Sequence, residues 1–162
     1  MAVKEADLLR RITTVEVNGA EKFVANDQQL KAANVGWTGS NFRALFLNKA
    51  EENVGKATIV VHSLEKNSLD VAIMAELGTR VEIHLCQFFA LIAKQSKGEA
   101  GPLLVNGYAN IAYIRGNDGN LWAVYAYWRS ACGYWHVYAD SVEYPREWHA
   151  GDQVLSRDSD SL

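Results

Sequence analysis

The chain has 162 residues, of which 49% are apolar and two are proline, and a net charge of −3, which predicts one domain with a hydrophobic core. It has no apolar stretch near the ~20 residues of a membrane span and no secretory signal, so we expect a cytoplasmic protein that does not bind membranes. No lysine follows Lys97, and acidic residues outnumber arginines beyond it. This balance argues against nucleic acid as a partner, because such binding depends on basic side chains.

The first part of the chain predicts a short helix and a hairpin. Leucine and isoleucine side chains at helical spacing indicate a helix over residues 4–12. The β-branched residues 13–17 then lead into an Asn-Gly dipeptide, which is typical of a tight hairpin turn. Residues 21–25 fit either the return strand of this hairpin or the start of a helix that ends near Gly36.

The middle of the chain predicts two strands followed by two helices. Residues 42–47 and 57–62 have the composition of strands, and Ser68 is a suitable N-cap for a helix over residues 69–77. The Thr-Arg-Val-Glu sequence at 79–82 fits a capping box at the start of a second helix. The apolar face of that helix, which should lie on a sheet, consists of Val81, Leu85, Phe88, Phe89 and Ile92.

Every tyrosine and four of the five tryptophans lie between Tyr108 and Trp148. In this stretch the hydrophobic period changes from that of a helix to that of a strand. The pattern predicts three antiparallel strands, over residues 108–115, 121–128 and 134–141.

The connections of these strands complete the C-terminal part. An Asp-Gly dipeptide favours a two-residue turn after the first strand, which would place Arg115 opposite Trp122. Residues 154–155 predict a short edge strand. The polar residues 156–162 predict a flexible C-terminal tail.

These elements predict an α+β fold with a single domain over residues 1–155. We expect an antiparallel sheet, built from the C-terminal meander and the N-terminal strands, with helices packed on one face. The order of elements is similar to that of cone-shaped α+β barrels of the nuclear transport factor 2-like type, in which helices close a strongly curved sheet over a pocket. This resemblance is one of architecture alone, and it implies a sheet curved into a cone or half-barrel.

Strand alternation sorts the side chains of the meander into a Trp-rich face and a Tyr-rich face. We expect the Trp-rich face to pack against the helices. The Tyr-rich face carries Tyr125, Tyr127, Tyr134, His136, Tyr138 and Asp140. A solvated face would show a cleaner polar pattern. We therefore expect the sheet to curl around a cavity on this side, or this face to be covered by another subunit or by the remaining chain.

We expect a binding or accessory protein that uses this aromatic surface either to form a homodimer or higher homo-oligomer or to bind a small molecule. Tyr and Trp combine a large apolar area with a hydrogen-bonding tip and are enriched at interfaces, where Lys is depleted, so the composition favours self-association. A module that binds carbohydrate or another polar ring is an alternative. The predicted ligand or interface residues are Tyr125, Tyr127, Tyr134, Tyr138, Trp128 and Trp135.

A small pocket enzyme of isomerase or hydrolase type is the other alternative, with His136 or Asp140 as general base and tyrosine hydroxyls as donors. The two residues lie four apart on one strand, about 13 Å, which is too far for a dyad. The remaining histidines, Cys86 and Cys132 lack the spacing of metal ligands, and no nucleotide-binding glycine motif is present. We therefore expect no metal and no cofactor, and two free thiols.

Overall fold

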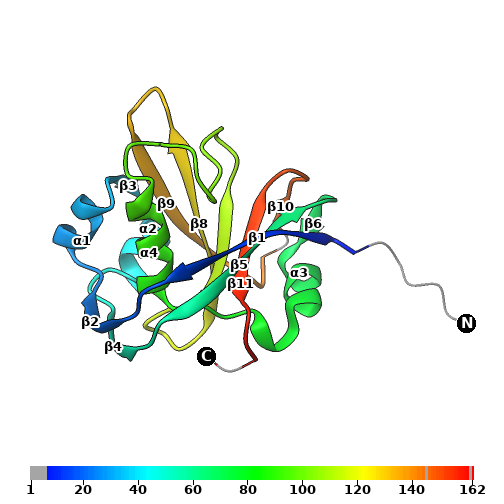
Figure 1. Ribbon diagram of the computed structural model, residues 1–162, viewed down its shortest axis with the longest axis horizontal. Coiled ribbons are helices and arrows are strands. Elements are labelled where there is room, and N and C mark those ends of the chain that lie inside the picture. The colour runs from blue at the N-terminus through cyan, green and yellow to red at the C-terminus, as the bar shows by residue number, and fades with distance from the viewer. Residues whose placement is uncertain (1–6, 145, 161) are drawn as a thin grey trace, which may run out of the picture.

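The computed structural model describes residues 7–144, 146–160 and 162. These residues form a seven-stranded sheet, two small two-stranded ladders, four α-helices and a 3₁₀ turn, η1 (Figure 1). The strands are β1 (Leu9–Val17), β2 (Ala20–Val24), β3 (Val35–Thr38), β4 (Ala50–Val54), β5 (Ala57–Leu64), β6 (Ser68–Leu69), β7 (Asn110–Arg115), β8 (Leu121–Arg129), β9 (Tyr134–Ser141), β10 (Glu147–Trp148) and β11 (Gln153–Arg157). The helices are α1 (Asp27–Ala32), α2 (Ser40–Leu45), α3 (Asp70–Leu77), η1 (Gly78–Arg80) and α4 (Leu85–Lys94). Within the described residues, none of these helices has the length and apolar character needed to cross a membrane.

The large sheet has the strand order β1-β5-β11-β7-β8-β9-β3. The meander β7-β8-β9 is antiparallel, but β11 pairs in parallel with β7, and β3 pairs in parallel with β9. The expectation of an antiparallel sheet is therefore correct for the meander and wrong for the sheet as a whole. Parallel pairing arises because β11 and β3 reach their neighbours through long connections rather than hairpins. β1 and β3 end the order without pairing to each other, so the sheet is open and does not close into a barrel.

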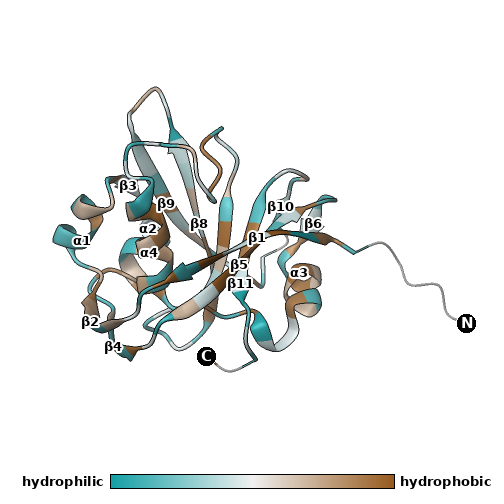
Figure 2. Cartoon of the chain, viewed as in Figure 1, coloured by the Kyte–Doolittle hydropathy of each residue, from teal (hydrophilic) through white to brown (hydrophobic). Residues whose placement is uncertain are grey.

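Helices lie on both faces of the sheet, whereas the sequence predicts helices on one. α4 covers the face to which β8 and β9 contribute apolar side chains, and its Phe88 belongs to one buried cluster with Val137. α3 lies on the opposite face, where Ile73 is buried in a second cluster with Ile111. Figure 1 shows the two helices toward different ends of the sheet. In Figure 2 hydrophobic residues gather on α3 and α4, while β8 and β9 stay pale because Tyr and Trp have intermediate hydropathy.

Two N-terminal elements differ from their predictions. β1 occupies part of the segment expected as a helix over residues 4–12, of which residues 4–6 lie outside the described part. Pairing with β5 along most of its length outweighs a short run of helical spacing. Residues 42–47, expected as a strand, fall in and just after α2. Phe42 and Phe46 lie one helical turn apart, and their rings stack with centroids 5.5 Å apart.

The β7–β8 connection is longer than the predicted two-residue turn. Arg115 pairs with Leu121 rather than with Trp122, so the loop spans residues 116–120. A shift of one residue moves every side chain of a strand to the other face. As a consequence, Tyr113 lies on the Tyr-rich face and not among the residues that face α4.

β11 lies in the middle of the sheet, between β5 and β7, and not at an edge as predicted. The tail boundary predicted after residue 155 falls inside this strand, since Ser156 is 2% exposed and Arg157 is 8% exposed. The guanidinium of Arg157 donates to the backbone carbonyls of Thr79 and Glu82. These bonds tie the end of β11 to the segment that joins α3 to α4.

α4 begins beyond the capping box predicted at residues 79–82. The buried Glu51 of β4 accepts the backbone N–H groups of the first two residues of α4, at 2.9 and 2.8 Å. Burial by itself would raise the pKa of this carboxyl group, but the bonds from His84 and Cys86 and the nearby ammonium of Lys49 lower it to about 2. A negative charge therefore lies at the N-terminus of α4, where the helix dipole favours it.

Candidate functional site

A continuous row of aromatic rings lies on the Tyr-rich face of β8 and β9. Neighbouring ring centroids in this aromatic row are between 5.1 and 5.7 Å apart, and the rings are close to parallel. The order of the rings is Tyr134, His136, Tyr127, Tyr138 and Tyr125. At its end, Trp148 of β10 meets Tyr125 edge-on, with centroids 4.9 Å apart. The four tyrosines predicted as ligand or interface residues all belong to this row.

The aromatic row lies on the same face of the sheet as α3, whose Ile73 belongs to one buried cluster with Tyr125. Elsewhere in the row, Tyr127, Tyr134 and Tyr138 remain partly exposed. Because the rings stack on one another, the row presents ring edges and hydroxyl groups rather than ring faces, and the hydroxyl of Tyr127 donates to that of Tyr138 at 3.3 Å.

Two glycines near the edge strand β3 accommodate the row. A Cβ atom at Gly36 would lie 2.2 Å from the ring of Tyr134, and one at Gly39 would lie 2.5 Å from a ring carbon of Tyr138. The rings therefore pack directly on the backbone.

His136, one of the two predicted general bases, lies inside the row and is 8% exposed. Its ring stacks between Tyr134 and Tyr127, and both ring nitrogens are buried without a hydrogen-bond partner among the described residues. Burial, together with the charge of Arg129, lowers the pKa of His136 below its usual value. The ring is neutral at pH 7, but its nitrogens are not open to a substrate, which a general base requires.

Asp140, the other predicted base, is paired with Arg146. Arg146 Nη1 lies 2.5 Å from Asp140 Oδ2 and also donates to the hydroxyl of Tyr125 at 2.9 Å. The guanidinium carbon lies 4.8 Å from the ring centroid of Tyr125 and 4.7 Å from that of Trp148. These ion-pair and cation–π contacts hold the arginine at the end of the aromatic row.

The two tryptophans predicted together with the tyrosines lie on the opposite face of the sheet. Trp135 is fully buried, and its indole N–H donates to the carbonyl of Gln95 at the end of α4, at 2.9 Å. Trp128 is half-buried and meets Trp135 edge-on, with centroids 5.6 Å apart. Both belong to the core beneath α4, so the structure does not bring them to the aromatic row.

A groove of about 400 Å³ lies beside the tryptophan end of the aromatic row. We call it the Arg146 groove; its lining includes Tyr108, Tyr125, Tyr127, Arg146, Trp148 and Asp152. Tyr108 is 47% exposed, and its ring packs against Gly151. Tyr108, Arg146 and Trp148 were not among the predicted site residues. Tyr108 was predicted as the first residue of a strand but lies in the connection before β7. Arg146 and Trp148 belong to a connection and to a two-residue strand that strand alternation does not place.

A buried carboxyl group holds one wall of the Arg146 groove from inside the protein. Asp70 is 1% exposed, and its Oδ1 accepts the hydroxyl of Tyr113 and the indole N–H of Trp148, each at 2.7 Å. Its Oδ2 is buried without a partner among the described residues. Burial raises the pKa of Asp70, although the two hydrogen bonds oppose this shift. Trp148 is thus fixed by Asp70 through its N–H and by the guanidinium through its ring.

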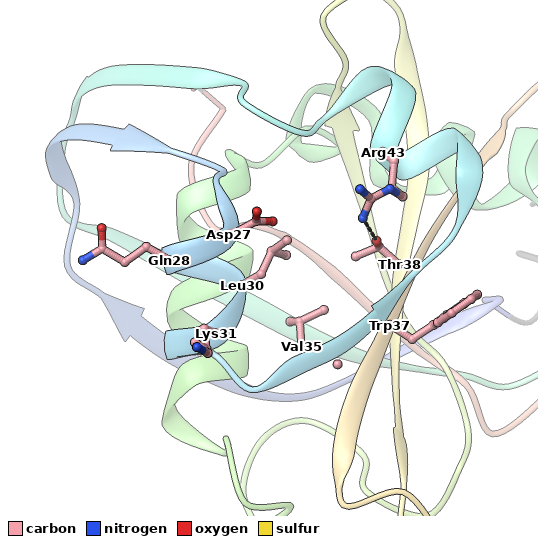
Figure 3. Close-up of a pocket in the computed structure, with 9 residues that line it drawn as sticks. Asp27, Gln28, Leu30, Lys31, Val35, Trp37, Thr38 and Arg43 are labelled. Atoms are coloured by element: carbon pink, nitrogen blue, oxygen red, sulfur yellow. Dashed lines mark hydrogen bonds between the residues drawn. The ribbon is translucent and has the colours of Figure 1, made fainter.

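A second hollow, of about 730 Å³, lies between α1, β3 and α2 (Figure 3). Arg43 donates to the hydroxyl of Thr38 at 3.3 Å in this hollow, and Trp37 is 54% exposed at its rim. In Figure 3 the side chain of Gln28 extends away from the hollow. Long exposed side chains lose conformational freedom when they close around a ligand. The walls of the Arg146 groove are already held in place, which makes that groove the stronger candidate.

No protein-family model, curated protein or solved structure matches the chain. The functional interpretation therefore depends on the geometry of the Arg146 groove and the aromatic row. Of the predicted residues, Tyr125 and Tyr127 line the groove. Tyr134 and Tyr138 belong to the row that supports them.

Proposed function

We propose that the protein binds a small uncharged molecule with a polar ring in the Arg146 groove and does not catalyse a reaction. The observation that carries this proposal is the presence, in one groove, of the exposed ring of Tyr108 beside hydrogen-bonding groups that are already fixed. Aromatic rings pack on the apolar face of a sugar-like ring, while N–H groups and carboxylates bind its hydroxyls. A volume of about 400 Å³ is within the range of small-molecule sites.

The charges around the groove favour an uncharged ligand. The positive charge of Arg146 is already paired with Asp140. The carboxylates of Glu147 and Asp152 also line the groove, and they would repel an anion. A cation would compete with the guanidinium for the ring face of Tyr125. A ring bearing hydroxyl groups avoids both penalties.

The groove also supplies preorganised donors. The two bonds that Arg146 makes to Asp140 and Tyr125 both use Nη1. Nε and Nη2 make no hydrogen bond to the described residues, so their N–H groups can donate to ligand oxygens. A donor that is ordered before binding costs little further entropy when the ligand arrives.

Two features favour binding over catalysis. His136 is stacked inside the aromatic row with its nitrogens buried, and Asp140 is engaged by the guanidinium. Neither residue is among those that line the groove. The groove therefore contains neither of the bases that the enzyme alternative requires.

Saturation-transfer NMR with methyl β-glucopyranoside and methyl β-galactopyranoside tests the proposal. We expect transfer to at least one glycoside, with a Kd on the order of 1 mM, or about −4 kcal/mol. Benzoate, an anionic ring, should show none. Tyr108→Ala should weaken binding roughly tenfold, because it removes an exposed ring from the wall without disturbing the core.

Trp37→Ala is the matched control, since it removes an exposed ring from the second hollow. This variant should bind like the wild type. Absence of transfer to both glycosides, or equal binding by Tyr108→Ala and the wild type, would show that the Arg146 groove is not a site for polar rings.

A further inference from the structure

The open edge of β3 lies along the second hollow. β3 ends the strand order, and within the described part of the chain no backbone hydrogen bond joins β3 to an element other than β9. All four residues of β3 line the hollow, together with residues of α1 and Arg43 of α2. A hollow on one face of a strand would be lined by alternate residues only. This hollow therefore follows the edge of β3, where free N–H and C=O groups can pair with another strand.

The two faces of β3 meet at this edge. Val35 pairs with Trp135, which lies in the core beneath α4, whereas Trp37 pairs with His136 of the aromatic row. The register shifts between Val35 and Trp37, and Figure 3 shows their side chains on opposite sides of the strand. A strand added at this edge would therefore place one set of its side chains in the hollow and the other set beside Trp37.

The side chains around the hollow carry an excess of positive charge. Lys31 and Arg43 are exposed, and neither forms an ion pair with another described residue. Asp27 is the one acidic residue among those that line the hollow. In Figure 3 Lys31 lies on the α1 side and Arg43 on the α2 side. Two unpaired cations beside an open strand edge are complementary to an extended segment that carries carboxylates.

We propose that the open edge of β3 binds an extended acidic peptide of a partner protein, which adds a strand to the sheet. The backbone of the peptide pairs with β3, and its carboxylates, spaced two residues apart, lie between Lys31 and Arg43. A second copy of this chain is a poorer occupant, because pairing β3 with itself about a two-fold axis would bring two sets of these cations together. This site goes beyond the proposed ligand function and does not depend on it.

Fluorescence anisotropy with a labelled octapeptide of alternating Glu and Val tests the charge preference. We expect a Kd on the order of 100 µM, and at least tenfold weaker binding when Lys replaces Glu in the peptide. Arg43→Glu should weaken binding of the Glu peptide at least fivefold, and adding Lys31→Glu should make the protein prefer the Lys peptide, which damage to the fold would not do.

Two variants are controls for these changes. Lys66→Glu makes the same change of charge as Arg43→Glu at an exposed lysine. It precedes β6, which lies at the other end of the molecule from α1 (Figure 1). Tyr108→Ala alters the Arg146 groove. Both variants should bind the Glu peptide like the wild type.

Two methylated peptides test whether the backbone pairs with β3. Successive amides of a strand point to opposite edges, so N-methylation of the Glu residues blocks one edge and N-methylation of the Val residues blocks the other. We expect one of these peptides to lose binding and the other to keep most of it. With the unmethylated peptide at ten times its Kd, hydrogen exchange of the open-edge amides of β3 should slow about tenfold.

Three results would overturn the proposal: no binding of the Glu peptide at about 1 mM, equal binding by the two methylated peptides, or a Kd unaffected by Arg43→Glu. Exchange at β3 that slows with rising protein concentration alone would show that a second copy occupies the edge, which would also overturn it.

Discussion

The two faces of the sheet formed by β8 and β9 are covered in different ways. On one face, α4 buries aliphatic and aromatic side chains, and Trp135 there is inaccessible to solvent. On the other, the aromatic row lies directly on the strands, and Tyr127, Tyr134 and Tyr138 remain partly exposed. One face is thus closed by α4, whereas on the other face α3 and Trp148 cover only the Tyr125 end of the row.

The difference shows how an aromatic face can remain accessible without being a large open hydrophobic patch. Stacked rings bury most of their apolar faces against each other and leave hydroxyl groups at the surface. The Arg146 groove lies at one end of this row, beside Tyr125. The partial exposure of Tyr127, Tyr134 and Tyr138 is therefore no sign that a subunit must cover them.

The largest expected difference between the faces concerns two consecutive residues. Trp135→Ala should lower the free energy of unfolding by about 3–5 kcal/mol, because it leaves a cavity in a close-packed core. Tyr134→Ala should lower it by only about 1 kcal/mol, the value of a stacked pair at a partly exposed site. Urea denaturation followed by circular dichroism measures both, without relying on the tryptophan that is removed.

These two variants are mutual controls, since they shorten adjacent side chains of one strand that point to opposite faces. Losses of similar size would mean that the aromatic row is as important to stability as the core beneath α4. In that case the two faces would not differ in the way that the burial indicates.

A buried carboxyl group anchors each side of the sheet, and the pKa values of the two groups shift in opposite directions. For Glu51, which holds the N-terminus of α4, the folded pKa is about 2 against an ordinary value of 4.5. The stabilisation is complete above pH 4.5 and is lost as the pH falls toward 2; it amounts to about 3 kcal/mol. Glu51→Gln should therefore be less stable than the wild type by about this amount at pH 7, and the difference should shrink at acid pH. A difference that does not change with pH would contradict the assigned role of the charge.

Much of the meander follows from the sequence because its pattern is local. Alternation and turn residues predict β7, β8 and β9 close to their observed bounds. They fail where a long-range partner decides the outcome. The segment of β1 has helical spacing but pairs with β5, and Ser156 looks like part of a polar tail but lies in the middle of the sheet.

The candidate site was only half predictable for a related reason. Tyr125 and Tyr127 follow from alternation along β8, but Arg146 reaches the groove from a connection whose path no periodic pattern determines. Tyr108 was predicted to begin a strand and instead lies in the connection before β7. The length of the β7–β8 loop caused the largest error in the predicted assignment of side chains to the two faces. A connection of five residues instead of two moved Tyr113 to the Tyr-rich face, where it donates to Asp70.

A substitution at Asp70 should give the smallest change in stability, and it tests the difference between the two faces most specifically. Its pKa is raised by burial, so the folded protein holds the proton more tightly than the unfolded chain does. Stability from this group is present below the ordinary carboxyl pKa of 3.8 and is lost as the pH rises through the folded value. Asp70→Asn keeps an acceptor for Tyr113 and Trp148 but cannot ionise, so its stability relative to the wild type should increase as the pH rises from about 4 to 8. Urea denaturation at several pH values measures this trend, which is opposite in sign to that of Glu51. A relative stability that falls with rising pH would contradict the raised pKa of Asp70.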